Sequence, residues 1–409
     1  MTRTLLAGPD LRAGGERWAA HVARVGALPA VDSRLTGLLG AAGLRGRGGA
    51  GFPAAVKWEA VARRARGGGA VVVANGAEGE PLSGKDRLLM GSRPHLVLDG
   101  ALLAATAVGA DRIVLYVGAE HGPAMAAMRG ALAERPEPAA RRVEVVGAPT
   151  GYVSGEESAA VRCIDGGPAL PRDVPPRPFE RGVAGRPTLV QNVETLAHAA
   201  LIARHGDAWF RDLADGGESG TALLTVTGAV AAPGVVELPQ GTPLGAAVTA
   251  AGGAVGDPRA VLLGGWFGGW VGATDAWSLP LDAAALRARG RGLGCGVIAV
   301  LGPDRCGIRE TASITGHLAR ASARQCGPCV FGLRAIAAAM DRIAAGTGTP
   351  ETLADVRRWA AELPGRGACH HPDGAAALIA SAVLVFADEF DVHVHGGRCT
   401  ATTVMAGAR

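Results

Sequence analysis

The chain has 409 residues, 48% hydrophobic and 19% charged, which excludes long disordered regions and leaves room for roughly two to four domains. Its 41 basic and 37 acidic residues leave a net charge of +4, so we expect neither a nucleic-acid partner nor an anionic membrane surface. There is no signal-peptide pattern and no run of about 18 uncharged apolar residues, which predicts a cytoplasmic protein without direct membrane insertion.

The N-terminal half alternates short β-branched runs with helical patterns. The predicted strands lie at 70–75, 112–118 and 142–147. The predicted helices lie at 95–109, 122–134, 156–163 and near 193–204. This alternation is typical of a buried, largely parallel sheet in an α/β domain.

The pattern of the chain changes twice after this region. Predicted strands at 223–228, 235–239 and 261–265 surround a helix at 243–252, which suggests a small separate β-grasp module. Helical patterns alone follow from about 307, at 308–322, 329–345, 350–362 and 374–388, and indicate a helical bundle. We therefore expect three domains, at 1–212, 218–303 and 304–409.

A glycine-rich stretch precedes the first predicted strand. Gly46, Gly48 and Gly49 lie in it, and glycine lets backbone N–H groups approach a phosphate closely. Lys57 follows, and Lys57 and Lys85 are the only lysines among 41 basic residues, which suggests that these two positions require a compact ammonium group. In a chain with 63 glycines, the glycine loop alone is a weak signal.

Two further stretches follow predicted strands. Asn75 comes directly after a strand and is followed by Glu78 and Glu80, at the kind of strand end where ligands bind in α/β sheets. Glu156 and Glu157 lie at a second junction between strand and helix. The alternative interpretations are a solvated turn for the first pair and simple helix capping for the second.

Taken together and in this order, these motifs resemble a known family. The chain reads Gly-Arg-Gly-Gly-Ala-Gly-Phe-Pro, then Asn-x-x-Glu-Gly-Glu-Pro, then Gly-Glu-Glu, then Pro-Thr-Leu-Val-Gln-Asn-Val-Glu-Thr from position 187. This series resembles the NADH-binding flavoprotein subunit of respiratory complex I and its relatives in NAD-linked hydrogenases and formate dehydrogenases. The resemblance covers nearly the whole chain and implies a Rossmann-like flavin and NADH domain, a β-grasp module and a C-terminal helical bundle.

The resemblance implies two cofactors, FMN and NAD(H). The FMN site would comprise Gly46, Gly48, Gly49, Lys57, Asn75, Glu78, Glu80, Tyr152, Gly155, Glu156, Glu157, Val190, Gln191, Asn192 and Thr195. Phe52 and Phe179 would clamp the adenine of NADH, and Glu80 and Glu157 would orient its nicotinamide as the catalytic residues.

Several positions depart from the family pattern. Ala77 stands where the family carries an aspartate, Ala60 where it has an aromatic residue, and Gln191 where it usually has asparagine. Arg177 could replace the charge of a lost lysine before Phe179. We expect weaker affinity for both flavin and NADH as a result.

The cysteines suggest an iron–sulfur cluster. Seven cysteines without a secretion signal argue against a disulfide framework, and Cys326, Cys329 and Cys369 have the spacing of cluster ligands. The resembled family uses four cysteines for a [4Fe–4S] cluster, and Ala323 occupies the first of those positions. The cluster could have three cysteines and an outside ligand, could be completed by Cys306, or could be absent.

Other interpretations of the cysteines remain open. A lone Cys-x-x-Cys can bind zinc or form a redox pair. His370 or His371 could supply the missing ligand, whereas Cys163, Cys295 and Cys399 suggest structural or incidental thiols.

The predicted function is that of an FMN-dependent NADH dehydrogenase module. It would accept a hydride from NADH onto FMN and pass electrons singly to an iron–sulfur cluster or a ferredoxin-type partner subunit, as part of a hetero-oligomeric complex that is peripheral to the membrane through its partners. The alternative is a docking subunit that keeps the fold without electron transfer, which Ala77 and Ala323 would permit. A component of a ferredoxin:NAD reductase is a third interpretation, disfavoured because repeated ferredoxin cysteine motifs are absent from the sequence.

Overall fold

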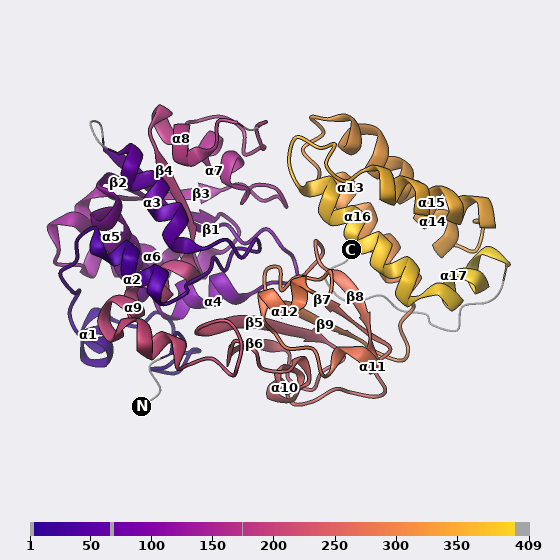
Figure 1. Cartoon of the computed structure of the whole chain (residues 1–409), viewed down its shortest axis with the longest axis horizontal. Helices are drawn as coiled ribbons and strands as arrows, with labels where there is room; N and C mark the ends of the chain where they lie inside the picture. Colours follow the sequence, from indigo (N-terminus) through magenta and orange to yellow (C-terminus); the bar gives the residue numbers. More distant parts are fainter. Residues whose placement is uncertain (1–3, 66–68, 174, 397–409) are drawn as a thin grey trace. The chain divides into compact units, whose positions relative to one another are not determined.

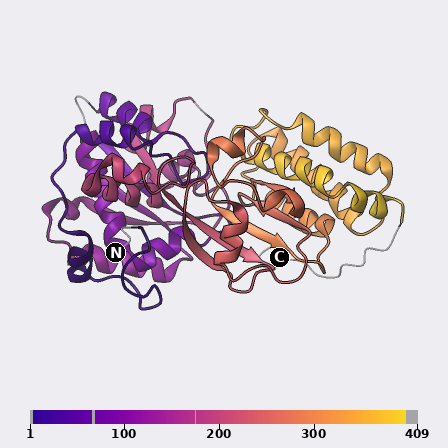
Figure 2. The same ribbon diagram turned by 60° about the horizontal axis from the view of Figure 1, so that its bottom comes forward.

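The structure is a computed structural model that describes residues 4–65, 69–173 and 175–396. Figures 1 and 2 follow the chain along its length. It divides into two compact units. The first comprises Met1–Gly79, Gly84–Leu223 and Glu237–Gly241, and the second comprises Glu80–Ser83, Leu224–Val236 and Thr242–Arg409. The short segment Glu80–Ser83 therefore leaves the first unit and joins the second.

The first unit is built on a four-stranded sheet. Its strands are β1 (Ala70–Gly76), β2 (Ala110–Gly118), β3 (Val143–Ala148) and β4 (Thr188–Asn192), in the order β3-β2-β1-β4. Every neighbouring pair is parallel, which confirms the predicted parallel sheet. β4 is absent from the predicted strands. Three of its five residues are polar, and it owes its burial to pairing with β1 rather than to its own pattern.

Helices surround this sheet. They are α1 (Trp18–Val25), α2 (Arg34–Ala41), α3 (Ala54–Arg64), α4 (Lys85–Ser92), α5 (Pro94–Val108), α6 (Gly122–Glu134), α7 (Glu157–Ile164), α8 (Pro178–Arg181) and α9 (Val193–Arg211), with 3₁₀ turns at Pro138–Arg142 and Val183–Gly185. The helices predicted from the sequence in this region are confirmed as α5, α6, α7 and α9.

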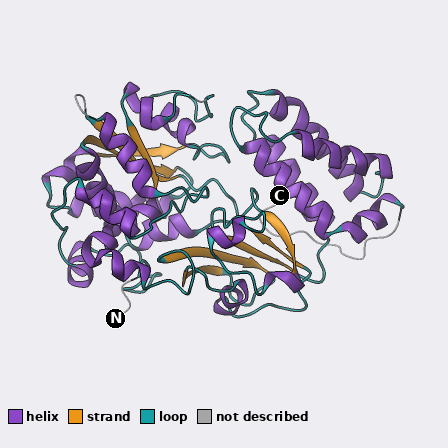
Figure 3. Ribbon diagram, in the orientation of Figure 1, coloured by secondary structure: helices purple, strands orange, loops and turns teal. Residues whose placement is uncertain are grey.

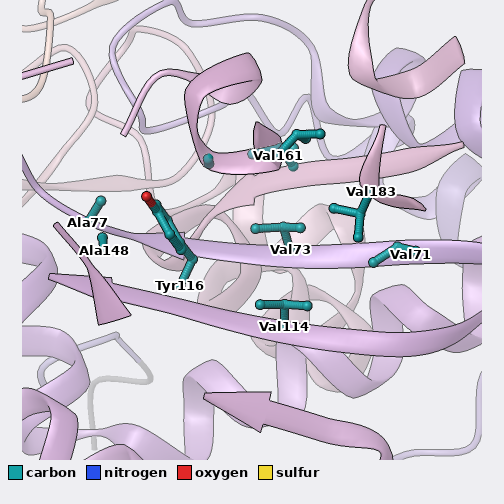
Figure 4. Close-up of a cluster of buried hydrophobic side chains, with 10 residues drawn as sticks. Val71, Val73, Ala77, Val114, Tyr116, Ala148, Val161 and Val183 are labelled. Atoms are coloured by element: carbon teal, nitrogen blue, oxygen red, sulfur yellow. The ribbon is translucent and has the colours of Figure 1, made fainter. Parts of the chain in front are cut away.

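The packing around β1 explains why most of its residues are apolar. Val71 and Val73 of β1 pack with Val114 and Tyr116 of β2 and with Val161 of α7, on one face of the sheet (Figure 4). The alternate β1 residues are equally buried, because α5 and α9 contact β1 as well. A parallel strand covered on both faces needs no polar positions.

The second unit contains a five-stranded mixed sheet. Its strands are β5 (Thr221–Gly228), β6 (Gly234–Pro239), β7 (Ala260–Leu263), β8 (Gly269–Gly272) and β9 (Val297–Leu301), in the order β6-β5-β9-β7-β8, with the first residues of β5 and the last of β6 counted in the first unit. β5 and β9 are parallel, whereas β7 is antiparallel to both β8 and β9. The short helices α10 (Leu244–Ala250), α11 (Ala273–Ala276) and α12 (Ala283–Arg287) connect these strands.

The C-terminal part of the second unit is helical (Figure 3). It contains α13 (Gly307–Arg320), α14 (Leu333–Ala344), α15 (Pro350–Glu362), α16 (His371–Val385) and α17 (Ala387–Val394), with one π turn, Pro328–Gly332, leading into α14. The sequence predicts four of these helices but not α17, because the pattern at 374–388 runs across the break at Phe386. Within the described ranges, no helix has the length and apolar character needed to cross a membrane.

Candidate functional site

Two of the sequence motifs meet at the carboxyl end of the parallel sheet. The register of β1 and β4 places Asn75 opposite Asn192, and Ala74 opposite Gln191. Val190, one residue earlier, is buried and pairs with Val73. Motifs separated by more than a hundred residues therefore lie side by side, at the edge where ligands bind in parallel α/β sheets.

The segment after β3 closes over this edge. The Asn75 side-chain amide donates a 2.8 Å hydrogen bond to the carbonyl of Gly155, and the Tyr116 hydroxyl donates one of 3.2 Å to the carbonyl of Ser154. A Cβ atom on Gly79 would lie only 2.8 Å from the carbonyl oxygen of Tyr152, so this close approach of two backbones requires glycine.

The glycine-rich loop is fastened to the same edge. The Gly46 N–H donates to the Phe52 carbonyl at 2.8 Å, which closes the loop, and the Arg47 N–H donates to the Thr195 hydroxyl at 2.9 Å. Gly49 has a φ of 116°, a conformation that other residues rarely adopt. Gly48 and Gly49 are exposed, and a Cβ atom on Gly48 would lie 3.3 Å from the Asn192 side chain, so the loop passes beside the start of α9.

An ion pair joins α3, which follows the glycine-rich loop, to α7, which follows β3. The Lys57 ammonium of α3 lies 2.8 Å from the carboxylate of Glu157, the first residue of α7, and both side chains are about one-quarter exposed (24% and 25%). Arg177 lies 3.8 Å from the other oxygen of Glu157. Glu157 is therefore a charged group accessible to solvent and held between two cations.

The neighbouring carboxylates have structural partners. Glu156 caps α7 by accepting from the N–H groups of Ser158 and Ala159, as the capping interpretation expected. Glu78, at a φ of 44°, accepts from two N–H groups at the start of α4, those of Asp86 and Arg87, each at 2.9 Å. Both orient a helix that borders the site.

Glu80 belongs to the second unit. Its carboxylate is buried and accepts from the Trp266 N–H at 2.8 Å and from the Leu82 N–H at 3.2 Å. Within that unit, Glu80 anchors the turn after β7.

A buried charge cluster lies beneath the Asn192 edge of the site. The Lys85 ammonium, 2% exposed, lies 2.7 Å from Asp86 and 2.8 Å from Glu194. Asp86 also accepts a 2.7 Å hydrogen bond from the Asn192 amide, so the cluster holds a predicted site residue in place. The rarity of lysine singles out Lys85 in the sequence, but no sequence signal identifies Glu194 as its partner.

The electrostatics of this cluster follow from burial and from mutual attraction. Burial opposes ionisation of Glu194, but Lys85, His198 and Arg47 together outweigh it and lower the pKa of Glu194 to about 2. For Asp86, burial dominates over the same lysine and raises the pKa to about 6. Lys85 stays protonated, because its two carboxylates raise its pKa despite burial.

The aromatic residues lie in different environments. Phe52 is 53% exposed beside the glycine-rich loop, whereas the Phe179 ring is covered by the Arg64 guanidinium, 4.8 Å from its centroid. The indole N–H of the buried Trp58 donates a 3.2 Å hydrogen bond to the side-chain oxygen of Gln191. The sequence alone does not identify Trp58, and this hydrogen bond accounts for an amide side chain at position 191.

Three predicted cluster ligands lie close together in the second unit. Cys329 is buried in the π turn, and its amide donates to the Cys326 carbonyl at 3.1 Å. Burial, followed by the neighbouring Cys326 and Cys369 thiols, raises the pKa of Cys329 to about 12. In the described part of the chain, however, no group of three histidine, cysteine, aspartate or glutamate side chains has the geometry to hold a metal ion.

The alternative ligands are engaged elsewhere. Cys306 caps the N-terminus of α13, and its sulfur lies 3.4 Å from Nε2 of His393. The loop that carries Cys326 follows the other end of α13, which is about 20 Å long. His371 is bonded through Nε2 to the Leu318 carbonyl at 2.8 Å, and His370 pairs with Asp373 at 3.0 Å. Cys306, one of the alternatives left open by the sequence, therefore lies at the opposite end of α13 from Cys326. Cys399 lies outside the described residues.

The donors at the sheet edge of the first unit fit the flavin that the sequence implied. An exposed glycine loop, an accessible ammonium and amide side chains at a sheet edge are suited to a phosphate and a planar polar ring. Cys326, Cys329 and Cys369 have the chemistry of iron–sulfur ligands once they are deprotonated, but their side chains do not have the geometry of a metal site in the described structure.

Comparison with known proteins identifies the same regions. The profile of the Nuo51 FMN-binding domain matches residues 39–200, that of the SLBB domain residues 223–265, and that of the NADH-ubiquinone oxidoreductase-F iron-sulfur binding region residues 309–393. In the NAD⁺-reducing [NiFe]-hydrogenase in its air-oxidized state, a chain 33% identical in sequence superposes with a TM-score of 0.79 over 88% of this chain, which spans 62% of that longer chain.

Curated relatives match over most of their length. The second F-type subunit of the NADH-quinone oxidoreductase of Rhizobium meliloti is 32% identical over 369 residues, 87% of this chain and 87% of the relative. The F-type subunit of the NADH-quinone oxidoreductase of Escherichia coli is 31% identical over 371 residues, 86% of this chain and 82% of the relative. The chain therefore belongs to the family of F-type subunits of NADH-quinone oxidoreductases.

Proposed function

We propose that this protein is the NADH-oxidising flavoprotein module of a hetero-oligomeric electron-transfer complex, with FMN as its flavin. The observation that carries this proposal is the pairing of Asn75 with Asn192 beside the Gly155 segment, within the residues that match the FMN-binding profile. FMN, when bound, supplies the chemistry that turns a two-electron hydride donor into single-electron steps.

The residues of the first unit would divide the work of holding FMN. Gly46, Gly48 and Gly49 with Lys57 would bind the phosphate; the remaining contacts would come from Asn75, Glu78, Tyr152, Gly155, Glu156, Val190, Gln191, Asn192 and Thr195. Phe52 and Phe179 would contact the adenine of NADH, which requires the Arg64 guanidinium to move from the Phe179 ring or to stack with the adenine. Glu80 would help to orient the nicotinamide, as the resemblance implies.

The domain organisation follows the same proposal. Residues 1–212 would form the Rossmann-like flavin domain, 218–303 the β-grasp module and 304–409 the iron–sulfur bundle. The mixed sheet of β5 to β9 and the SLBB match support the second of these assignments. Partner subunits would place the protein at the cytoplasmic side of a membrane.

Glu157 is the carboxylate best placed to orient the nicotinamide. It is accessible and held by Lys57, so Glu157→Gln should slow flavin reduction by NADH about 10–100-fold through misorientation of the substrate, while FMN stays bound. Stopped-flow bleaching of the flavin band measures this rate. Glu59→Gln, the same change on an exposed α3 residue, is the control. Loss of FMN with a normal rate in the molecules that retain it would contradict this role.

The second unit would hold a [4Fe–4S] cluster on Cys326, Cys329 and Cys369. Ala323 lies three residues before Cys326, where a fourth cysteine of the family would stand. Ala323→Cys should raise the iron content toward four per chain, as measured by iron and acid-labile sulfide analysis of anaerobically purified protein. Equal iron in both proteins would mean that the loop no longer supports the family's fourth ligand.

An ultraviolet–visible spectrum of anaerobically purified protein, before and after addition of NADH, tests the function itself. Flavin bands that bleach support the proposal, and a broad shoulder in the visible range reports the cluster. A second candidate, a docking subunit without electron transfer, is favoured by Ala77, which is buried in an apolar cluster where the resembled family carries a carboxylate. A protein that stays colourless after FMN is supplied would support this second candidate.

A further inference from the structure

Arg64, the last residue of α3, lies over an aromatic ring rather than in a close ion pair. Its guanidinium carbon is 4.8 Å from the centroid of the Phe179 ring, and α3 contacts α8, the helix that contains Phe179. Among the described residues, its one ion pair is with the carboxylate of Glu180 at 3.9 Å, which is too long for a hydrogen bond. The guanidinium is therefore held mainly by its contact with the ring.

Arg64 uses little of its hydrogen-bonding capacity. A guanidinium group has five N–H donors. Within the described part of the chain, Arg64 donates one hydrogen bond, of 3.1 Å, to the carbonyl of Ala60, one turn earlier in α3. The Arg64 side chain is 43% exposed, so donors remain for a ligand that lies beside Phe179.

The carboxylates beside this arginine already have partners. One oxygen of Glu180 accepts a 2.9 Å hydrogen bond from the Arg177 N–H at the start of α8, and Glu157 is held by Lys57 at 2.8 Å. In the dinucleotide sites of α/β folds, a carboxylate binds the 2′-hydroxyl of NADH, whereas an arginine accommodates the 2′-phosphate of NADPH. The surroundings of Phe179 match the second arrangement.

The residues of α8 add positive charge to this region. Arg177 precedes the helix, and its side chain is 53% exposed and lies 3.8 Å from Glu157. Arg181 is the last residue of α8 and is exposed. Residues 177–181 therefore carry two cations and one carboxylate around Phe179, a charge balance that favours a phosphate group.

Position 60 distinguishes this region from the resembled family. That family carries an aromatic residue there, whereas this chain has alanine, and Arg64 lies one turn later on the same face of α3. A guanidinium stacks on planar rings as an aromatic side chain does, and it also donates paired, charge-assisted hydrogen bonds to a phosphate. The pair Ala60 and Arg64 thus combines stacking with recognition of an anion.

We propose that Arg64 binds the 2′-phosphate of NADPH, so that the protein oxidises NADPH as well as NADH. The adenine would contact Phe179, and the guanidinium would donate hydrogen bonds to the 2′-phosphate, which carries about two negative charges near pH 7. The inference rests on the proposed function, because it takes Phe179 as the residue that contacts the adenine. The nicotinamide is the same in both coenzymes, so the hydride and its electron pair go to the same acceptor.

Calorimetric titration of the oxidised, FMN-loaded full chain with NADP⁺ and with NAD⁺ tests this assignment without turnover. The wild type should bind NADP⁺ at least as tightly as NAD⁺. Arg64→Ala should raise the Kd for NADP⁺ about 10–100-fold, and should lower the ratio of the NAD⁺ Kd to the NADP⁺ Kd about fivefold or more. Arg64→Lys, which keeps the charge but not the planar fork, should retain part of the preference for NADP⁺.

Arg63→Ala is the matched control, because Arg63 is the preceding residue of α3 and pairs with the exposed Glu59 at 3.6 Å. This variant should change both Kd values by less than about twofold. An unchanged ratio of the two Kd values in Arg64→Ala would overturn the proposal, as would a wild type that binds NADP⁺ about tenfold or more weakly than NAD⁺.

Failure of the proposed function gives a different result. Bleaching of the flavin by NADH, measured on the same wild-type sample, reports the proposed function, whereas the ratio of the two Kd values reports the 2′-phosphate site. A wild type that NADH bleaches but that discriminates against NADP⁺ would overturn the inference about Arg64 alone.

Discussion

Replacing Lys85 by methionine should lower the free energy of unfolding of the first unit by about 3–5 kcal/mol. The ammonium is 2% exposed and lies within 2.8 Å of both Asp86 and Glu194, so its removal leaves two carboxylates buried without their cation. Methionine keeps the length and apolar stem of lysine, so lost packing contributes little. Thermal unfolding followed by circular dichroism should show a transition roughly 10 °C lower.

The matched control is Arg112→Met, which breaks an exposed ion pair with Glu144 on the same sheet. Exposed pairs contribute about 1 kcal/mol or less, so this variant should unfold near the wild-type temperature. If both variants unfold at the wild-type temperature, the buried cluster does not stabilise the unit. Because Asp86 also holds the Asn192 amide, Lys85→Met should weaken FMN binding as well.

Lys57→Ala should raise the Kd for FMN by roughly 5–150-fold, which corresponds to about 1–3 kcal/mol of charge-assisted hydrogen bonding to a phosphate. Lys57 is accessible, lies on α3 just after the glycine-rich loop, and is held by Glu157 at 2.8 Å. The loss should appear in a titration of apoprotein with FMN followed by quenching of flavin fluorescence.

Two further variants test whether the change in Kd comes from the positive charge at position 57 or from a general change in α3. Lys57→Arg retains the charge and should recover most of the affinity, although the planar guanidinium does not reproduce the compact ammonium. Arg63→Ala removes a cation from the same helix, where its partner is the exposed Glu59, and should leave Kd unchanged. An unchanged Kd in Lys57→Ala would remove this lysine from the phosphate site.

Local patterns predict most of the regular structure. β1, β2 and β3 are recognisable because they are β-branched runs, and α5, α6 and α7 because their periodicity is intrinsic to the segment. β4, β8 and β9 escape prediction. They are four or five residues long and are defined by pairing with neighbouring strands, so the information resides in the partners rather than in the run itself.

The site is predicted unevenly for a related reason. The motif order identifies which residues gather at the sheet edge, and the register of Asn75 with Asn192 agrees with it. Glu78, Glu156 and Glu157 look alike as acidic residues near helix starts. Only their distances separate two helix-capping carboxylates from the one held by Lys57.

The sequence by itself determined the family and the parallel sheet and predicted which residues are candidate ligands, because motif spacing and hydrophobic period are properties of neighbouring residues. Only the tertiary structure decided which group each charged side chain contacts. Lys85 meets Glu194 across 109 positions, and Glu80 meets the Trp266 amide across 186. Coulombic attraction and desolvation depend on distance and burial, which exist only once the chain has folded.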